Sequence, residues 1–580
     1  MKILAIHDGH NASCCYLEHG EIQDLALEER FTQKKNQSGY PHKSIEWVLN
    51  RHSLAFSDLD CVVFPHLTPP VCFDQESLEQ YTPLRVFHML LCEVMPKRII
   101  GSNHLVSPYV RIFSQFRRNT IKKYAKANGL PLDKIKQVEH HIAHGYAALY
   151  GSGFMNEKEP IIIFTADNSG DGLSSTVSAW DSSSGFRRIH INQSFNSIGE
   201  LYSRVTEYLG MRMAEHEYKV MGMAPYADGR FSERTHHILS RYICLDNYGL
   251  SFRNKKTYGY GLLQKMKKDL FRHRFDSICY AMQKVLEDLV VTWVANWCKK
   301  TGIRRAVFGG GVFMNVKLNL LLTELPELDN VYFFPSSSDE STAIGAGYYA
   351  NEKWSGEAIK PLGPIYKGPD YSDGEIECSL AKFSDKVVYK KENDIEWTIA
   401  KLISEGNIVG RFQGRSEWGA RALGNRSICC RADDLRIITK LNKAVKRRDF
   451  WMPFAPSILE EDVDNYVVNT KNIFGPYMMV AFYSKSLAQK HFPAALHPYD
   501  KTCRPHVVRK EWNPRYHKLL TFFKNLTGIG AILNTSFNLH GWPIVNSPDD
   551  ALRTLINSGL DYVAIENYLI RAKPNIQSVN

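Results

Sequence analysis

Residues 161–180 read IIIFTADNSGDGLSSTVSAW, and this stretch decides the fold. An apolar run leads into a turn of Asp, Asn, Ser and Gly, and a β-branched run leads out, which predicts a strand, a tight turn and a second strand. The first twenty residues repeat the pattern as KILAI, HDGHNAS and CCYLEHG. Gly9 is predicted to take the positive φ of a hairpin that wraps a phosphate. Two such hairpins predict a duplicated, two-lobed architecture.

A helix and a glycine run follow the second hairpin. Residues 275–300 carry an apolar stripe at helical spacing, and the short strand RAVF then leads into Gly309, Gly310 and Gly311. A strand that ends in glycines lets the backbone approach a nucleotide, so Gly310 and Gly311 are candidate nucleotide-binding residues. The order of elements matches the layout of the actin, Hsp70 and sugar kinase (ASKHA) superfamily. Ordinary hairpins without a nucleotide site are the alternative.

The composition is that of a folded globular protein. The 580 residues are 44% hydrophobic, and 72 Lys and Arg against 61 Asp and Glu give a net charge of +11, which excludes disorder and a fibrous fold. Neither a run of about 18 apolar residues nor a signal peptide is recognised, so we expect a cytoplasmic protein without a membrane partner. The 12 cysteines include no C-x-x-C pair, so we expect reduced thiols.

The chain is expected to contain two domains. Residues 351–370 are rich in Gly, Pro and Lys without periodicity and are predicted to form a linker. We therefore expect a first domain over residues 1–355 and a second α/β domain over residues 371–580. Near the end of the second domain, Ser547-Pro548 with an acid at position 550 predicts the start of a helix.

Two histidines and two aspartates form a candidate metal site. His140 and His144 stand four residues apart in VEHHIAHGYAALY, a run of helix formers, so both rings would project from one helical face. Asp167, at the end of an apolar strand, and Asp339, before a glycine-rich helix, are candidate carboxylates. Such a set suits Fe, Mn or Zn. The alternative is a helix without metal, with one histidine packed and the other solvated.

The second domain concentrates cations that suit phosphate and carboxylate oxygens. They are Arg415, Arg421, Arg426, Lys446, Arg447, Arg448 and Arg504. Surface salt bridges are the alternative for any one of them. The sequence contains no P-loop, no dinucleotide-binding fingerprint and no G-x-S-x-G elbow, which argues against those three classes of enzyme.

Nine motifs, spread over nearly the whole chain, resemble those of the NodU/CmcH-type carbamoyltransferases, which make O-carbamoylated natural products. They are GHNAS at 9–13, EERFTQKKNQSGYP at 28–41, HHIAH at 140–144, YKVMGMAPYAD at 218–228, GGGVFMN at 309–315, GRSEWGARALGNRS at 414–427, KAVKRRDFWMPFAP at 443–456, TCRPHVV at 502–508 and LNTSFNLHGWPIV at 533–545.

The resemblance implies a duplicated ASKHA-like domain followed by a YrdC-like α/β domain. The YrdC-like domain would make carbamoyl adenylate from carbamoyl phosphate and ATP, with Mg²⁺ accompanying ATP, and the ASKHA-like domain would pass the carbamoyl group to an alcohol. Fe²⁺ or another divalent metal is expected on His140, His144, Asp167 and Asp339.

The resemblance also assigns roles to further residues. His10 and Lys35 match catalytic positions, and we expect His10 to be the base that takes the alcohol proton. Carbamoyl phosphate or ATP is expected at Lys446, Arg447, Arg504, Arg421, Asn534 and Ser536, and a nucleotide at Gly310, Gly311 and Asn315. Asn11, Asn36, His506 and Trp542 depart from the family pattern.

The expected partner is a hydroxylated small molecule, with residues 80–125 and 190–275 around it, and nucleic acid is not expected. The alternative function is a tRNA threonylcarbamoyl-type transferase, which the basic residues 253–274 favour and the fusion of both activities in one chain disfavours. The absence of C-x-x-C pairs argues against a hydrogenase-maturation enzyme of the HypF type. The complete candidate metal set argues against an inactive nucleotide-binding protein.

Overall fold

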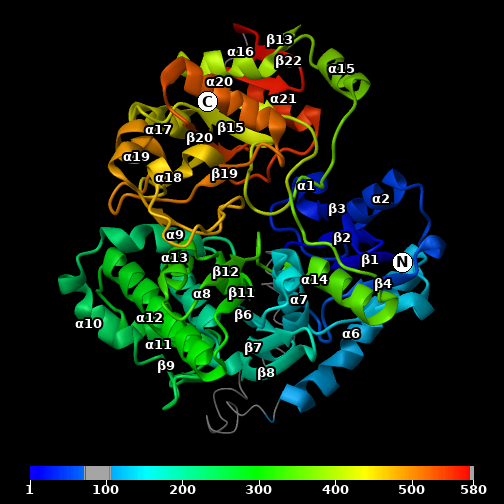
Figure 1. Ribbon diagram of the computed structural model, residues 1–580, viewed down its shortest axis with the longest axis vertical. Coiled ribbons are helices and arrows are strands. Elements are labelled where there is room, and N and C mark those ends of the chain that lie inside the picture. Colours follow the sequence, from blue (N-terminus) through cyan, green and yellow to red (C-terminus); the bar gives the residue numbers. More distant parts are fainter. Residues whose placement is uncertain (71, 73–103, 105, 575–580) are drawn as a thin grey trace. The chain divides into compact units, whose positions relative to one another are not determined.

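The computed structural model describes residues 1–70, 72, 104 and 106–574 (Figure 1). Contacts within the chain divide it into two compact units. The first comprises Met1–Glu28 and Asn36–Gly363, and the second comprises Glu29–Lys35 and the chain from Pro364 onward. The break after Gly363 falls inside the segment predicted as a linker. The segment Glu29–Lys35, assigned from the sequence to the first domain, groups instead with the second unit.

The first unit contains a five-stranded sheet in the order β3-β2-β1-β4-β5. Its strands are β1 (Lys2–His7), β2 (Ser13–Glu18), β3 (Glu21–Leu27), β4 (Cys61–Phe64) and β5 (Ile135–Gln137). The first three strands form an antiparallel meander, while β4 runs parallel to β1 and β5 parallel to β4. The N-terminal hairpin predicted from the sequence is therefore present.

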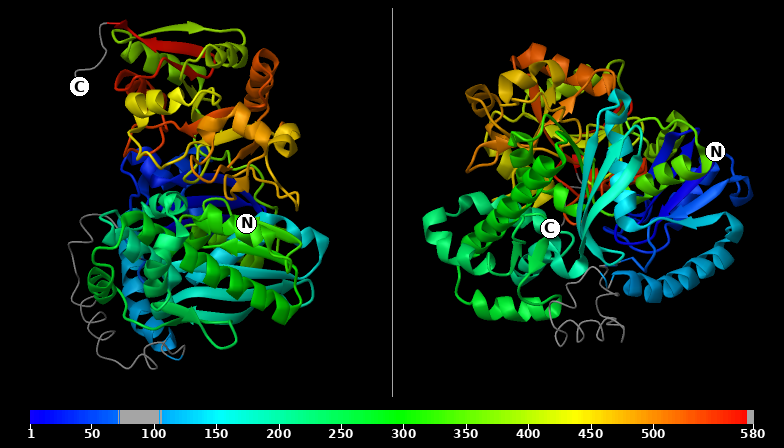
Figure 2. Two further views of the ribbon diagram at one scale, coloured as in Figure 1. Left: turned by 90° about the vertical axis from the view of Figure 1, so that its left-hand side faces the viewer. Right: turned by 60° about the horizontal axis from the view of Figure 1, so that its bottom comes forward.

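A second five-stranded sheet repeats this topology in the order β12-β11-β6-β7-β8. Its strands are β6 (Ile161–Gly170), β7 (Leu173–Asp181), β8 (Gly185–Gln193), β11 (Arg305–Gly309) and β12 (Asn330–Phe333). Again the first three strands are antiparallel and the last two run parallel to the first (Figure 2). The duplication predicted from the two hairpins is present.

Two helices cover the facing sides of these sheets. Helix α7 (His140–Ser152) packs on β6 and β11, helix α14 (Ser341–Ala350) packs on β1 and β2, and the two helices pack on each other (Figure 1). A Cβ atom at Gly345 of α14 would lie 1.7 Å from the carbonyl oxygen of Ala143, so only glycine permits this approach.

The other elements of the first unit surround this core, and α12 confirms the long apolar helix expected over 275–300. They are α2 (His42–Arg51), α6 (Val106–Asn128), α8 (Ile198–Tyr208), α9 (Glu217–Met223), α10 (Gly229–Leu239), β9 (Ile243–Leu245), β10 (Phe252–Asn254), α11 (Tyr260–Asp269), α12 (Phe275–Thr301) and α13 (Val316–Glu324). The short helix α1 (Glu28–Thr32) belongs to the second unit except for its first residue.

The second unit is built on an eight-stranded mixed sheet in the order β13-β22-β21-β14-β15-β20-β16-β19. These strands are β13 (Val387–Lys391), β14 (Val409–Phe412), β15 (Arg426–Cys430), β16 (Ala455–Leu459), β19 (His506–Val508), β20 (Ala531–Ser536), β21 (Tyr562–Ile565) and β22 (Tyr568–Ala572). Strands β14 and β21 are parallel, as are β16 and β19, and the remaining pairs are antiparallel.

Helices flank this sheet, so both units are mixed α/β structures, as predicted. They are α15 (Asp373–Lys382), α16 (Ile395–Ser404), α17 (Arg436–Leu441), α18 (Val463–Tyr466), α19 (Ser486–His491), α20 (Pro514–Thr527) and α21 (Pro548–Ile556), and a short ladder joins β17 (Phe482–Tyr483) to β18 (Thr502–Cys503). Helix α21 begins where the sequence predicted, with Ser547 and Asp550 in a reciprocal capping box.

The backbone prediction for Gly9 was wrong. In the β1–β2 turn, Asn11 is the residue with positive φ, 59°. Gly9 is required for space instead, because a Cβ there would lie 2.8 Å from both the His7 ring and the Pro70 side chain. Asparagine tolerates the left-handed conformation better than most residues with a side chain.

Three further expectations can be compared with the described residues. Their cysteines are all free thiols. None of their helices combines the length and the apolar character that a membrane span requires. Of residues 80–125, expected near an acceptor, positions 80–103 and 105 lie outside the described part.

Candidate functional site

Four side chains singled out from the sequence converge in the first unit. His140 and His144 project from α7, Asp167 from β6, and Asp339 from the turn before α14, with one ligand atom of each within 4.8 Å of the others. His140 Nε2 lies 3.2 Å from an Asp167 oxygen and 4.0 Å from an Asp339 oxygen. His144 Nε2 lies 3.4 Å and 3.8 Å from the same two atoms.

Buried hydrogen bonds hold these four side chains in place. The Glu139 carboxylate caps α7 by accepting from two backbone N–H groups, and Asp171 accepts from the backbone N–H of His140 at 2.9 Å. His144 Nδ1 lies 3.1 Å from the Ser341 hydroxyl, which directs Nε2 toward the carboxylates. Gly170 leaves the space that the His140 ring fills, since a Cβ there would lie 2.0 Å from the ring.

The charges of the cluster fit a divalent cation. Burial raises the pKa of Asp167, but the His140 hydrogen bond and the neighbouring His144 ring outweigh it and hold that pKa well below its usual range. Burial and the adjacent Asp167 charge raise the pKa of Asp339 well above its usual range. A cation would relieve the repulsion between the two carboxylates. His144 Nε2 is buried without a hydrogen bond, which leaves its lone pair available to a metal.

Two histidines that the sequence analysis missed lie beside this cluster. The His66 ring is 4.8 Å from the His140 ring, and His66 Nε2 is 3.2 Å from His7 Nδ1. Burial lowers the pKa of His7 to about 3, so this histidine is neutral. A signal existed, because His7 ends β1 and His66 follows the parallel neighbour β4, and the ends of parallel strands meet at one sheet edge.

The two residues predicted to be catalytic belong to different units. His10 is buried in the β1–β2 turn, and its Nε2 lies 3.1 Å from the carbonyl oxygen of Ala214. The next residue, Asn11, donates to Glu340, the neighbour of Asp339 in sequence, at 3.3 Å. Lys35 belongs to the second unit, where its positive charge acts on Lys446.

The glycine run after β11 packs tightly on the strand that carries Asp167. Gly310 has a φ of 97°, and a Cβ there would lie 2.3 Å from the Ala166 carbonyl oxygen. A Cβ on Gly311 would lie 2.8 Å from an Asp167 carboxylate oxygen. Asn315 caps α13, and its amide exchanges hydrogen bonds with Gln283. Packing and capping account for these residues, and nucleotide binding at them stays a prediction.

The second unit contains a cluster of buried cations. Lys446 is buried and Arg504 is half-buried, and among the described residues the charges that shift their pKa values are those of other cations. Burial, followed by the charges of Arg448 and Lys35, lowers the pKa of Lys446 well below its usual range. Burial, followed by Arg421 and Arg448, lowers that of Arg504. The charges of Lys35, Arg421 and Arg448 thus act on Lys446 and Arg504, and such a gathering of positive side chains is suited to a bound anion.

Of the other residues predicted to bind carbamoyl phosphate or ATP, some lie beside Lys446 and one is exposed. Ser536 and Asn534 both lie on β20. The Lys446 ammonium donates to the Ser536 hydroxyl at 3.1 Å, and the Asn534 amide donates to the Ser457 hydroxyl at 3.0 Å. Arg447 is exposed and has a left-handed φ of 44°, whereas the next residue, Arg448, reaches Thr535 at 3.1 Å. The sequence named Arg448 among the cations but did not assign it to the site.

Two arginines of the candidate cation set have structural roles. The Arg426 guanidinium is fully buried and donates to four backbone carbonyl oxygens, including those of Gln413 and Pro369. Arg415 donates to the carbonyl oxygens of Gly368 and Lys367. Both therefore fix the loop at 413–425 to the chain that enters the second unit.

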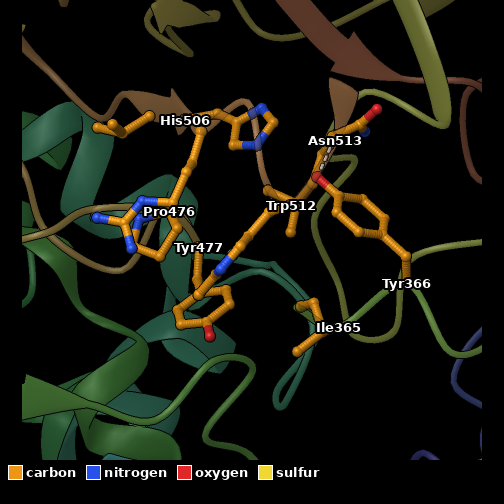
Figure 3. Close-up of a pocket in the computed structure, with 10 residues that line it drawn as sticks. Ile365, Tyr366, Pro476, Tyr477, His506, Trp512 and Asn513 are labelled. Atoms are coloured by element: carbon orange, nitrogen blue, oxygen red, sulfur yellow. Dashed lines mark hydrogen bonds between the residues drawn. The ribbon is translucent and has the colours of Figure 1, made fainter. Parts of the chain in front are cut away.

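A small pocket with several aromatic side chains in its lining lies within the second unit (Figure 3). It is lined in part by Tyr366, Tyr477, His506 and Trp512, and the Tyr477 and Trp512 rings are 5.6 Å apart. The His506 ring lies 3.1 Å from the Ser457 hydroxyl, which Asn534 also contacts. Burial lowers the pKa of His506 to about 3. Trp542, another departure from the family pattern, is 54% exposed.

Comparisons with known proteins identify the class of enzyme. Residues 2–348 match the family model described as carbamoyltransferase N-terminus, and residues 400–572 match that described as carbamoyltransferase C-terminus. Together with the α/β fold and the two polar clusters, these matches define an enzyme that transfers carbamoyl groups. The chain belongs to the carbamoyltransferase family.

Similar proteins come from archaea and bacteria. An uncharacterised protein of Methanocaldococcus jannaschii is 30% identical over 99% of this chain and 100% of its own length. Nodulation protein NolNO of Sinorhizobium fredii is 28% identical over 97% of this chain and 79% of its own. The 3'-hydroxymethylcephem-O-carbamoyltransferase of Amycolatopsis lactamdurans is 26% identical over 46% of this chain and 48% of its own.

Proposed function

We propose that the protein is an ATP-dependent O-carbamoyltransferase that works at two sites, one in each unit. The observation that carries the proposal is the pair of cations formed by buried Lys446 and half-buried Arg504, whose pKa values are shifted by burial and by other cations among the described residues. Burying a cation is costly unless an anion offsets it, so such a pair is suited to a substrate that brings its own negative charge. Carbamoyl phosphate is such a substrate.

The two folds support this division. The repeated sheet order of the first unit is consistent with an ASKHA-like transfer domain, and we propose a YrdC-like role for the second unit because it holds the cation cluster. Asn534 and Ser536 both lie on β20, and the Lys446 ammonium donates to the Ser536 hydroxyl. We therefore propose that ATP and carbamoyl phosphate meet at this end of β20.

The proposed reaction has two stages. Carbamoyl phosphate and water first give carbamate and phosphate, and a carbamate oxygen then attacks the α-phosphorus of ATP to form carbamoyl adenylate and pyrophosphate. Lys446 and Arg504 bind the anions, and their positive charges stabilise the negative charge that develops on the phosphate oxygens. In the second stage an alcohol oxygen attacks the carbamoyl carbon, AMP leaves, and the alcohol proton passes to His10.

The first unit supplies the groups for the transfer stage. His140, His144, Asp167 and Asp339 would hold the metal, Fe²⁺ or another divalent ion, which would act as a Lewis acid toward phosphate oxygens. His10 precedes Asn11, which donates to Glu340, the residue after the candidate ligand Asp339. The relative in Amycolatopsis is named for a hydroxymethyl acceptor, and we infer that the acceptor here is also a hydroxylated small molecule.

Separating the two stages by mutation tests the proposal. Lys446→Ala should abolish carbamoyl-phosphate-dependent pyrophosphate release, and product should return when carbamoyl adenylate is supplied. His10→Asn should retain pyrophosphate release but lower product formation about 10²–10⁴-fold, the usual effect of losing a general base. Product is measured as the mass gain of one carbamoyl group in a panel of hydroxylated natural products.

Lys443→Ala is the matched control for Lys446→Ala, because Lys443 is exposed on the same helical turn. It should leave both stages unchanged. If His10→Asn stops pyrophosphate release as completely as Lys446→Ala does, the assignment of one stage to each unit is wrong.

A further inference from the structure

The turn between α8 and α9 contains a strained alanine that contacts His10. Ala214 has a φ of 57°, a conformation that a residue with a Cβ adopts only at a cost. Its carbonyl oxygen lies 3.1 Å from His10 Nε2. Strain of this kind persists only where the surrounding structure enforces it.

Glu217 enforces this conformation. Its carboxylate accepts from the backbone N–H of Ala214 at 2.7 Å and from the Ser203 hydroxyl at 2.9 Å. Ser203 lies on α8, so one carboxylate oxygen ties the turn to that helix. The Ala214 carbonyl is thereby held at a fixed position toward the His10 ring.

Helix α8 is also tied to a candidate metal ligand. Its cap, Ser197, donates to the carbonyl oxygen of Asp167 at 3.2 Å, and a Cβ on Gly199 would lie 2.8 Å from that same oxygen. A single helix therefore relates the backbone of Asp167 to the group that contacts His10. In the proposed transfer step the alcohol lies beside both the metal and His10, so the two sites must keep a fixed separation, which α8 would provide.

A carbonyl oxygen only accepts hydrogen bonds, so His10 Nε2 must carry its proton to bond with Ala214. We propose that Ala214, clamped by Glu217, is the positioning residue for His10 and makes Nδ1 the nitrogen that receives the alcohol proton. The proposal rests on the base role of His10 in the proposed function, and it adds which ring nitrogen acts and which residues fix it.

Nuclear magnetic resonance of the full-length protein with ¹⁵N-labelled histidine tests this without any acceptor. We expect neutral His10, assigned by its absence in His10→Asn, to show a proton on Nε2 that exchanges slowly with water. Glu217→Ala should speed this exchange by at least about tenfold because the turn opens more often. Ser203→Ala, a milder change, should move it in the same direction.

Two controls separate positioning from general damage. Glu217→Gln keeps a side-chain oxygen that can accept the same bonds and should restore slow exchange. Glu215→Ala, in the same turn, should not change it. A proton on Nδ1 in the wild type, or unchanged exchange in both Glu217→Ala and Ser203→Ala, would overturn the proposal. Because this readout needs no turnover, its failure is distinct from a failure of His10→Asn to lower transfer.

Discussion

Single residues of this protein differ in how their buried charges are compensated. In the first unit, Arg117 pairs with Asp8 through two bonds of 2.6 and 2.7 Å, and the Asp167 carboxylate faces two imidazoles. In the second unit, the charges that act on buried Lys446 and half-buried Arg504 among the described residues are those of other cations. The Arg117–Asp8 pair is compensated within the chain, whereas the cluster around Asp167 suits a cation and the pair Lys446 and Arg504 suits an anion.

The metal assignment predicts a selective loss of metal. His144→Ala removes one of four ligands, so metal content in purified protein should fall sharply from about one ion per chain. His141→Ala is the matched control, since His141 is equally buried on α7 but contacts Thr165 instead of the carboxylates. Elemental analysis measures both. Full occupancy in His144→Ala would exclude the assignment.

Buried His506 predicts a pH dependence of stability. Its pKa falls from 6.5 to about 3 on folding, so between these values the unfolded chain binds a proton that the folded chain does not. Stability is therefore lost as the pH falls below 6.5, by roughly 1.4 kcal/mol per pH unit from this residue. His506→Gln should remove that contribution.

Urea unfolding of wild type and His506→Gln at pH 7.5 and pH 5.5 measures the difference. On lowering the pH, the free energy of unfolding should fall more for the wild type than for His506→Gln. Equal shifts in both proteins would show that His506 does not cause the acid sensitivity.

The limits of sequence reasoning are visible at neighbouring residues. Arg447 and Arg448 are indistinguishable in a run of cations, but Arg447 follows the five-residue helical turn at 442–446 with a left-handed backbone and is exposed. Arg448 then points to Thr535. The left-handed backbone at Arg447 occurs without a glycine or asparagine at that position, so the sequence does not predict it.

At the scale of elements, the pattern of the sequence was more informative. Both hairpins, the helix that carries His140 and His144, the long helix α12 and the capped start of α21 were predicted from alternation, spacing and capping residues. These signals are local. The pairing of β4 with β1 and β5, and of β11 with β6 and β12, depends on contacts between distant segments and was not predictable from the pattern alone.

The junction of α6 with the first hairpin predicts a large loss of stability. Arg117→Met leaves Asp8 buried without its partner, so we expect a loss of about 3–5 kcal/mol. The double change Asp8→Asn with Arg117→Met should cost less, because no unpaired charge remains. Arg118→Met, exposed on the next residue of α6, is the control. Urea unfolding measures all three, and equal stability of Arg117→Met and Arg118→Met would contradict the expectation.

At the scale of the whole molecule, the segment Glu29–Lys35 belongs to the second unit, which gives Lys35 a second role to test. The resemblance implies a catalytic position for Lys35, and its charge acts on Lys446 in the second unit. We predict that Lys35→Ala weakens carbamoyl-phosphate-dependent pyrophosphate release about three- to tenfold, a modest effect because Lys35 is exposed. Lys34→Ala should have no effect. Normal pyrophosphate release in Lys35→Ala, with transfer from supplied carbamoyl adenylate lost, would favour the original assignment.

The path of the chain has a consequence for how the gene can be divided. The polypeptide passes from one unit to the other after Glu28, again after Lys35 and a third time after Gly363. A reading frame cut at the obvious linker would give a C-terminal product without Lys35 and without Arg30, whose guanidinium donates to the Gly419 carbonyl oxygen at 2.7 Å. Splitting this gene into two independent enzymes would therefore require a copy of the seven-residue segment Glu29–Lys35 in the downstream half.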